Sequence, residues 1–221
     1  MLIPERFNGP PGTGNGGWCS GVFAGAAGAR VGGPAFQVTL RVPPPLATPM
    51  DLRDGSVHAG ETLVAEVSEA AVAGEGVPPV PLATAIEASK AYPGFTGHPF
   101  PTCFVCGPER PARDGLAIFP GVLEDGRTAA PWTVPGDVSM ESMWAALDCP
   151  GGWAAIARGQ AYVLGRITAA VHALPEPGDE CVVTGAAVEI AGRKATVDST
   201  VYGPAGDRLA TARATWIAVI K

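Results

Sequence analysis

The sequence has little charge and no excess of basic residues. Charged residues make up 16% of the 221 residues, and the formal net charge is −6. A nucleic-acid surface needs clustered lysine and arginine, so this composition argues against that class of partner. No uninterrupted apolar run approaches the roughly 20 residues that a membrane-spanning helix requires. The first residues also lack the basic and apolar blocks of a signal peptide, so we expect no membrane association.

The cysteines do not suit a disulfide framework. There are five of them, an odd number, without a regular spacing. This pattern predicts reduced thiols and a cytoplasmic protein. The 30 glycines and 23 prolines indicate many turns, but hydrophobic residues make up 47% of the chain, which is too many for disorder.

Two short stretches occur twice. Gly16-Gly17-Trp18 returns as Gly151-Gly152-Trp153, and each copy opens a run of small and apolar residues. Leu82-Ala83-Thr84-Ala85 returns as Leu209-Ala210-Thr211-Ala212. A recurring unit of a helix followed by strands indicates an internal duplication. We therefore predict two copies of one unit, packed against each other.

The predicted boundary between the units lies in a segment rich in proline and glycine. We place the first unit, with an abbreviated N-terminus, at residues 1–92, and the second at 93–221. The second unit begins with an entry segment that contains Cys103 and Cys106 in a CxxC spacing.

Each unit is predicted to contain a buried central helix. The helix after Gly16-Gly17 has no charge before Arg30, and a helix that is apolar all round is buried on all sides. Thr13 or Asn15 is the candidate N-cap. We expect the second central helix to begin at Gly151-Gly152, and a separate short helix, capped by Ser139, to precede it at 139–147.

The remaining segments alternate or are rich in β-branched residues, which predicts strands. The predicted strands are 36–42, 50–53, 62–68, 81–88, 116–119, 127–134, 162–173, 180–190, 195–202 and 209–219. The fold class is therefore α+β, with two antiparallel sheets that each wrap around a central helix. Joined edge to edge, the two sheets would leave few open edges.

One motif connects this pattern with a known family. Cys103-Phe104-Val105-Cys106-Gly107 leads through Asp114-Gly115-Leu116 toward the predicted hairpin, and a Gly-Gly step opens each predicted central helix. In these features the sequence resembles the hotdog-fold acyl-CoA thioesterase superfamily, in particular the phenylacetate-pathway type of thioesterase. The likeness covers nearly the whole chain, which implies a tandem double hotdog.

The resemblance also implies where the catalytic groups would lie. The Gly-Gly step in this family usually follows a histidine, and that position holds Asn15 in the first unit and Pro150 in the second. The family often has a carboxylate two turns into the helix, and the corresponding positions are about Ala24 and Gly159. Both groups are therefore expected to be absent from both units.

The candidate catalytic residues are Asp148 and Asn15. Asp148 can act as a general base on water that Asn15, from the other unit, orients. The alternative role for Asp148 is an N-cap. Cys149 can gain thiolate character near a helix N-terminus, although a small buried residue is the simpler interpretation. Glu141 is an outside candidate that more commonly lies on a solvated helix face.

The candidate substrate-binding residues surround the two Gly-Gly steps. Backbone N–H groups at a helix N-terminus can bind a thioester carbonyl oxygen, or the glycines can serve only tight packing. We expect the acyl chain between the two central helices and the working site near Asp148 and Gly152. The full set is Gly16, Gly17, Trp18, Phe23, Trp144, Cys149, Gly151, Gly152 and Trp153.

The CxxC pair is not predicted to bind a metal. Cys103 and Cys106, with His98 nearby, have a zinc-like spacing on one side only, and the other cysteines are scattered. A structural zinc site needs four ligands. We therefore expect free thiols, no stoichiometric zinc and no organic cofactor.

The predicted function is binding of an acyl thioester such as an acyl-CoA, with hydrolysis as a further step. The alternative is a non-catalytic hotdog protein that binds an acyl group or another apolar ligand as a carrier or sensor. A hydratase would need a paired histidine and aspartate, and no such spacing is visible. The expected partners are a small-molecule acyl thioester and a second copy of the chain, forming a homodimer of double hotdogs.

Overall fold

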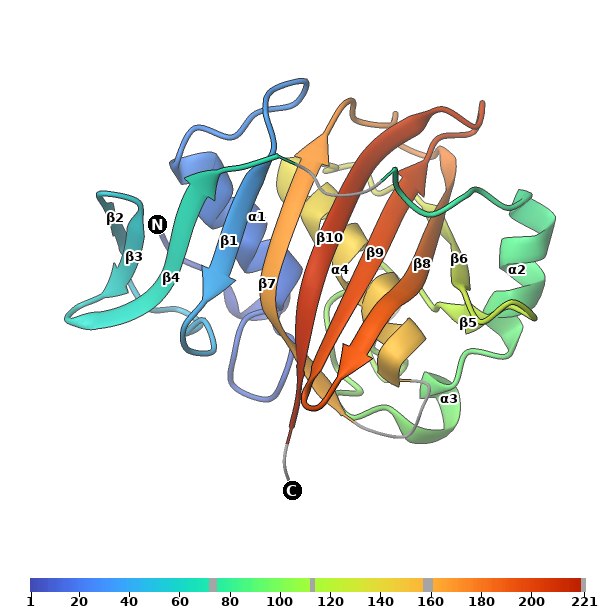
Figure 1. Ribbon diagram of the computed structural model, residues 1–221, viewed down its shortest axis with the longest axis horizontal. Helices are drawn as coiled ribbons and strands as arrows, with labels where there is room; N and C mark the ends of the chain where they lie inside the picture. The colour runs from blue at the N-terminus through green and yellow to red at the C-terminus, as the bar shows by residue number, and fades with distance from the viewer. Residues whose placement is uncertain (72–74, 112–113, 157–160, 220–221) are drawn as a thin grey trace.

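One continuous antiparallel sheet forms the framework of the molecule (Figure 1). The computed structural model describes residues 1–71, 75–111, 114–156 and 161–219. The N-terminal elements are η1 (Glu5–Phe7), α1 (Gly16–Ala26), β1 (Phe36–Leu40), β2 (Asp51–Arg53), β3 (Ser56–Ala59) and β4 (Thr62–Glu69). The remaining elements are α2 (Leu82–Lys90), α3 (Gly94–Gly97), β5 (Gly121–Val122), β6 (Thr128–Thr133), α4 (Met140–Ile156), β7 (Tyr162–Val171), β8 (Glu180–Ala191), β9 (Lys194–Tyr202) and β10 (Arg208–Ala218).

The order of the strands shows the duplication. The 10-stranded sheet runs β2-β3-β4-β1-β7-β10-β9-β8-β6-β5. After α1, the chain forms β1 and then the meander β2-β3-β4; after α4, it forms β7 and then the meander β8-β9-β10. Each meander returns to pair with the strand that directly follows its helix. The second copy has in addition the β5-β6 hairpin, which precedes its helix.

The two copies join edge to edge through the strands that follow their central helices, as the sequence predicts. β1 pairs with β7 in an antiparallel register that places Phe36 opposite Ala169 and Thr39 opposite Arg166. This pairing satisfies the backbone groups of what would otherwise be two open edges. The copies therefore share one sheet, and without the other copy β1 or β7 would have an unpaired edge.

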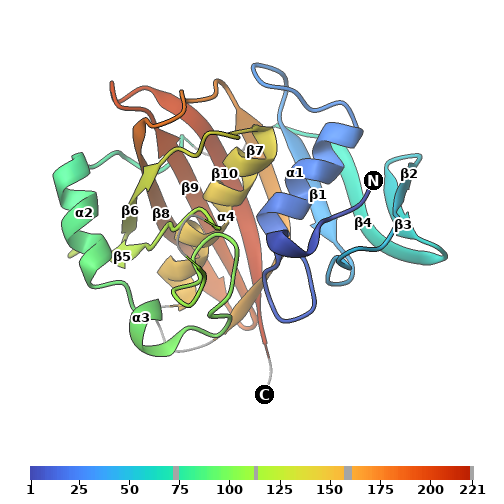
Figure 2. The same cartoon turned by 180° about the vertical axis from the view of Figure 1, so that it is seen from behind.

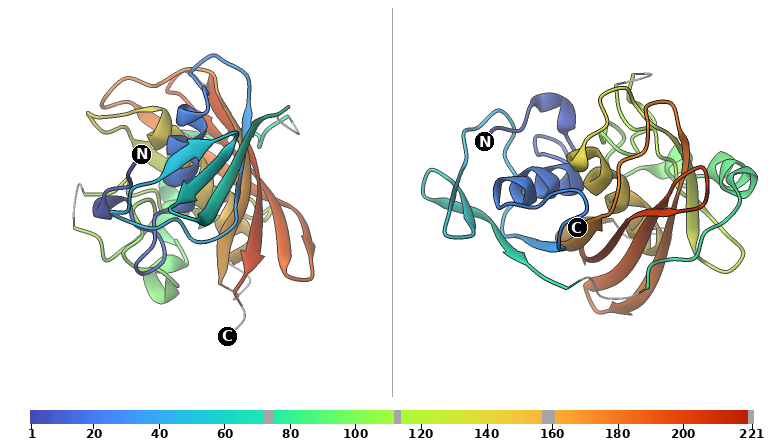
Figure 3. Two further views of the ribbon diagram at one scale, coloured as in Figure 1. Left: turned by 90° about the vertical axis from the view of Figure 1, so that its left-hand side faces the viewer. Right: turned by 90° about the horizontal axis from the view of Figure 1, so that it is seen from above.

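The two central helices lie side by side on one face of the sheet (Figure 2). Viewed from the end, the sheet curves around them (Figure 3). Both helices are apolar around their circumference, so they are covered on one side by the sheet and on another by each other. No described helix is both long and apolar enough to cross a membrane.

The strand predicted at 81–88 is wrong, because this segment forms helix α2. Leu82-Ala83-Thr84-Ala85 is therefore helical, whereas the same four residue types at 209–212 lie in β10. Alanine, leucine, glutamate and lysine favour a helix, and Ala85 packs in a small cluster with Ala129 and Val182. Because α2 covers β5 and β6, it packs on the second copy (Figure 1); the boundary at 92/93 itself stays a prediction.

The expected hairpin strand at 116–119 is also wrong. This segment instead runs beside the CxxC stretch, where the Leu116 and Ile118 N–H groups donate to the Phe104 and Val105 carbonyls. The hairpin partner of β6 is the two-residue β5 further along. The CxxC stretch is thus held by backbone hydrogen bonds to the described residues that follow it.

Candidate functional site

The first turn of α1 forms one wall of the candidate site. Asn15 is the N-cap, and its Oδ1 accepts the Trp18 N–H at 2.9 Å, as one of the two predicted caps requires. Gly16 and Gly17 are the first two helical residues. No described residue accepts a hydrogen bond from the Gly16 N–H, which is one of the donors that a helix N-terminus leaves unpaired.

Close neighbours leave no space for a side chain at the two glycines of this turn. A Cβ on Gly17 would lie 2.6 Å from both the Asp148 Cβ and the Trp144 carbonyl oxygen, so α1 and α4 touch here. A Cβ on Gly16 would lie 2.8 Å from the Leu164 side chain. The Gly-Gly step therefore allows tight packing and, at the same time, leaves the backbone N–H groups accessible to partners.

Asp148 of α4 meets this turn directly. Its Oδ2 accepts hydrogen bonds from the Gly17 N–H at 2.9 Å and from the Asn15 amide at 3.1 Å. The other oxygen, Oδ1, is buried and has no hydrogen-bond partner among the described residues. Asp148 and Asn15, from different halves, are thus in contact, while the catalytic roles predicted for them stay predictions.

Burial raises the pKa of Asp148 from its ordinary 3.8 to about 7. The residue is only 2% exposed, and desolvation disfavours the charged carboxylate. The nearby Cys103 also raises this pKa, whereas the hydrogen bonds from Gly17 and Asn15 lower it. A carboxyl group that titrates near neutrality can both accept and release a proton under physiological conditions.

The second Gly-Gly step does not begin a helix, and that prediction is wrong. α4 is a single helix from Met140 to Ile156, so Gly151 and Gly152 lie in its last two turns, with Pro150 inside the helix. Ser139 does cap it, because the Ser139 Oγ accepts the Ser142 N–H at 3.3 Å. The sequence suggested a helix start at Gly151 because Gly-Gly-Trp repeats there, whereas α4 continues through Pro150.

The second pair of glycines serves packing on the sheet. The Gly151 N–H donates to the Ser199 Oγ at 3.0 Å, and a Cβ on Gly152 would lie 2.5 Å from the Trp216 ring. These groups are therefore directed at β9 and β10. The expectation that Gly152 offers a second N-terminal N–H for the substrate has no structural basis.

Asp148 lies two turns after the start of α4 at Met140. The sequence placed the family's carboxylate position of the second copy at about Gly159, so the predicted absence there stays a prediction. In α1 the corresponding position is Ala24, as expected, and Gly159 lies outside the described residues.

A pocket of about 320 Å³ opens beside these groups. Of the predicted site residues, Asn15, Gly16, Asp148, Cys149 and Trp153 line it. Its other lining residues are mostly apolar: Gly9, Pro10, Thr13, Gly14, Leu40, Arg41, Val42, Pro43, His98, Pro99, Phe100, Cys103, Cys106, Ile156, Tyr162, Val163, Leu164, Gly165, Trp216 and Ile217. The start of β7 and the end of β10 were not predicted to contribute, because sequence spacing does not show which strand ends converge.

Three of the predicted lining aromatics lie elsewhere. Trp18 stacks on Phe7 with the ring centroids 3.7 Å apart. Phe23 and Trp144 are fully packed in the core around the two helices. These three residues shape the framework, whereas Trp153 is the aromatic side chain of that set that faces the pocket.

Glu141, the outside candidate, lies in the first turn of α4. It is near Gly25 in the last turn of α1, since a Cβ on Gly25 would lie 3.8 Å from the Glu141 Oε1. The two helices are therefore antiparallel, and Glu141 belongs to the end of the pair away from Asp148.

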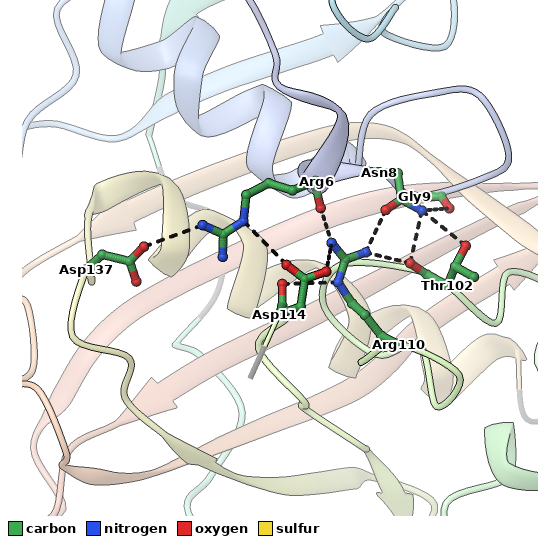
Figure 4. Close-up of polar contacts among 7 residues, drawn as sticks. All are labelled: Arg6, Asn8, Gly9, Thr102, Arg110, Asp114 and Asp137. Atoms are coloured by element: carbon green, nitrogen blue, oxygen red, sulfur yellow. Dashed lines mark hydrogen bonds and ion pairs between the residues drawn. The ribbon is translucent and has the colours of Figure 1, made fainter. Parts of the chain in front are cut away.

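A polar network fastens the N-terminal segment to the segment that follows the CxxC stretch (Figure 4). Arg110 donates to the Asn8 Oδ1 at 2.6 Å and to the Thr102 carbonyl at 2.8 Å, and pairs with Asp114 at 3.0 Å. Its side chain is only 8% exposed. This network holds the segment before α1 against the loop that carries Cys103 and Cys106.

Comparison with solved structures shows that the chain has the double hotdog fold. The tesB protein of Mycobacterium avium subs. paratuberculosis superposes with a TM-score of 0.62 at 13% identity, covering 100% of this chain and 91% of that one. A conserved protein of unknown function with a hot dog fold from Alicyclobacillus acidocaldarius gives a TM-score of 0.59 at 15% identity, covering 98% and 90%. Both matches extend over the two halves, as the predicted tandem requires.

A single-unit structure is similar over about half of the chain. The E. coli PaaI protein from the phenylacetic acid degradation operon covers 48% of this chain and 81% of its own, at 15% identity and a TM-score of 0.44. No family model matches the sequence, and no curated protein matches it. At these identities the likeness establishes the fold, while the chemistry has to come from the site.

Proposed function

We propose that this chain binds an acyl thioester, such as an acyl-CoA, and hydrolyses it with Asp148 as the general base. The observation that carries the proposal is the buried Asp148 carboxyl, held at the N-terminus of α1 and lining an apolar pocket.

The pocket suits the acyl group of such a substrate. Its walls include Leu40, Phe100, Trp153, Leu164 and Trp216. A volume of about 320 Å³ is at the lower end of ligand pockets, which start at roughly 300 Å³, and this favours a compact acyl or aryl group. The polar part of the thioester would then lie next to Asn15, Gly16 and Asp148.

The chemistry follows from the groups at that wall. Asp148 takes a proton from water as the water oxygen attacks the thioester carbonyl carbon. The Gly16 N–H, at the positive end of the α1 dipole, stabilises the negative charge that develops on the carbonyl oxygen. When the C–S bond breaks, Asp148 returns the proton to the leaving thiolate, which yields a carboxylic acid and a free thiol.

Asn15 orients the base in this proposal. Its amide donates to the Asp148 Oδ2, and the Gly17 N–H donates to the same oxygen. Both bonds engage Oδ2, and Oδ1 is the carboxyl oxygen that has no partner among the described residues. Homodimerisation of the double unit and a cytoplasmic location stay predictions.

The test is turnover of a panel of acyl-CoAs that ranges from acetyl to long-chain and aryl groups. The released thiol is measured after the protein is removed, because the chain has cysteines of its own. Asp148→Asn keeps the shape and removes the base, so it should lower the rate by roughly a hundredfold or more. Asp207→Asn, an exposed carboxylate in the turn before β10, is the matched control and should leave the rate unchanged.

Two outcomes would overturn the proposal. Equal rates for Asp148→Asn and the wild-type chain would remove Asp148 from the mechanism. Saturable binding of acyl-CoA by the wild-type chain without turnover would favour the alternative of a non-catalytic carrier or sensor.

A further inference from the structure

Three cysteine sulfur atoms meet at the pocket wall. The Sγ atoms of Cys103, Cys106 and Cys149 all lie within 4.8 Å of one another, and those of Cys106 and Cys149 are 3.2 Å apart. All three residues are buried. The sequence argued against a metal because a ligand beyond the CxxC pair and His98 would have to come from one of the scattered cysteines. α4 brings one of these, Cys149, to the pair.

The backbone of the CxxC stretch forms a tight turn that fixes the positions of its two cysteines. The Gly107 N–H donates to the Cys103 carbonyl at 2.9 Å, and a Cβ on Gly107 would lie 2.5 Å from the Cys103 nitrogen, so only glycine fits there. The Asn15 amide also donates to the Cys103 Sγ at 3.7 Å. Donors directed at a sulfur atom favour the thiolate, the form that binds metals.

His98 borders the cluster. Its Nε2 is 3.3 Å from the Cys106 Sγ, and its Nδ1 accepts the Phe100 N–H at 2.8 Å. In the neutral ring the proton is therefore on Nε2, where it can be donated to the Cys106 sulfur. His98 thus supports a thiolate at Cys106 as a hydrogen-bond donor, the role that residues around metal ligands commonly have.

The cluster is fixed in place from several sides. The Tyr92 hydroxyl donates to the Cys106 carbonyl at 3.1 Å, and the Phe104 N–H donates to the Asn8 carbonyl at 2.8 Å. Arg110 ties the N-terminal segment to Thr102, directly before the first cysteine (Figure 4). A preformed set of ligands of this kind needs little rearrangement to bind an ion.

We propose that Cys103, Cys106 and Cys149 form a binding site for Zn²⁺, with the fourth ligand coming from the pocket that they line. Thiolate sulfur is a preferred ligand of zinc, and sites with three protein ligands keep the fourth position for water or another small group. Three neighbouring buried thiolates would repel one another without a cation, so zinc binding and loss of the thiol protons would occur together.

The test measures metal bound to the full-length chain, purified from zinc-supplemented cells without chelator. Elemental analysis should find about one zinc per chain. Cys149→Ser should lower this content by roughly tenfold or more, because it removes one of three ligands. Cys181→Ser, a buried cysteine in β8 away from the cluster, is the matched control and should keep its zinc.

A second measurement covers the case in which a serine variant fails to fold. Co²⁺ added to the metal-free wild-type chain should give the sulfur-to-metal charge-transfer bands of thiolate ligation, and zinc should displace it. A wild-type chain with neither bound zinc nor these bands would overturn the proposal, as would a Cys106–Cys149 disulfide in the purified chain. Neither readout depends on hydrolytic activity, so this result is independent of the proposed reaction.

Discussion

The two ends of the α1–α4 pair use the same helices but carry different chemistry. At the pocket end, the N-terminus of α1 meets Asp148 of α4. At the opposite end, the N-terminus of α4 meets Gly25 of α1, whose hypothetical Cβ would lie 3.2 Å from the Met140 methyl group. The position in α1 that corresponds to Asp148 is Ala24. The duplicated framework therefore provides two helix ends, and the complete set of groups for the proposed reaction is at one of them.

This difference shows what each copy contributes. The first copy supplies a capped helix end with Asn15, Gly16 and Gly17, and the second supplies the carboxylate. The first copy has no counterpart of the β5-β6 hairpin among its described residues. Its meander and helix are instead held by β7 and α4, so we regard it as the part that completes the site of the second copy.

The largest expected effect comes from separating the two copies. Fragments 1–71 and 75–221 should each fail to fold alone, because β1 loses β7 and the apolar faces of α1 and α4 become exposed. The second fragment includes Val77, whose N–H and carbonyl bind Thr200 and Tyr202. Circular dichroism and thermal melting of each fragment, and of both co-expressed, provide the measurement. Cooperative melting of either fragment alone would contradict the account.

A pair of glycine variants compares the two ends by stability. Gly17→Ala should destabilise the chain by about 1–3 kcal/mol, because the new methyl group would overlap Asp148 and the Trp144 carbonyl. The new methyl group of Gly25→Ala would lie near only the ends of two flexible side chains, the Met140 methyl and the Glu141 Oε1, and the change gains helix propensity of up to about 1 kcal/mol. Chemical denaturation of both variants measures the free energy of unfolding. Equal losses at the two positions would show that the ends are packed alike.

The raised pKa of Asp148 predicts how stability depends on pH. Because its folded pKa of about 7 exceeds the ordinary 3.8, the folded chain holds this proton more tightly than the unfolded chain. Wild-type stability should therefore fall as pH rises between these two values, by up to about 1.4 kcal/mol per pKa unit. The Asp148→Asn variant lacks this contribution. The unfolding free energy of the variant minus that of the wild type should therefore increase as pH rises over the same range. A constant difference between pH 4 and 8 would contradict the assigned burial.

The smallest effects come from the two helix caps. Asn15→Ala and Ser139→Ala should each cost about 1 kcal/mol, since each removes the side-chain acceptor of a helix N-terminus. Only Asn15→Ala also removes a donor to Asp148, which should raise the pKa of that carboxyl and shift the pH dependence of hydrolysis upward. Denaturation of both variants measures what each cap contributes to stability, and their pH–rate profiles measure what Asn15 contributes to the pKa of Asp148. Matching pH profiles would contradict the role given to Asn15.

Much of the fold could be predicted because the relevant signals are local. Alternation of apolar and polar residues and a high content of β-branched residues predicted the meander strands other than β3, and an uncharged glycine-rich stretch predicted α1 as a buried helix. The errors arose where tertiary contacts determine the secondary structure and the local sequence does not. Leu-Ala-Thr-Ala is a helix at 82–85, where it covers β5 and β6, and a strand at 209–212, where it has strands on both sides. Intrinsic propensity is too weak to separate these two cases.

The site was predicted in part. The contact between Asn15 and Asp148 was expected, but for a helix that would begin at Gly151. The Ser139 cap marked the true start of α4, yet the Gly-Gly-Trp repeat suggested a second helix start at Gly151, which lies inside α4. The approach of Cys149 to the CxxC pair depends on how α4 lies against the 98–107 loop, and no sequence spacing contains that information.

The most direct measurement of the central claim is the pH dependence of kcat/KM for acyl-CoA hydrolysis. The active form of Asp148 is the carboxylate, so the wild-type value should rise with pH and level off above an apparent pKa of about 7. In Asp148→Asn the remaining rate should be roughly a hundredfold lower and should lack this inflection. Glu141→Gln, at the opposite end of the helix pair, should retain both the rate and the inflection. An unchanged inflection in Asp148→Asn, or its loss in Glu141→Gln, would contradict a single working end built around Asp148.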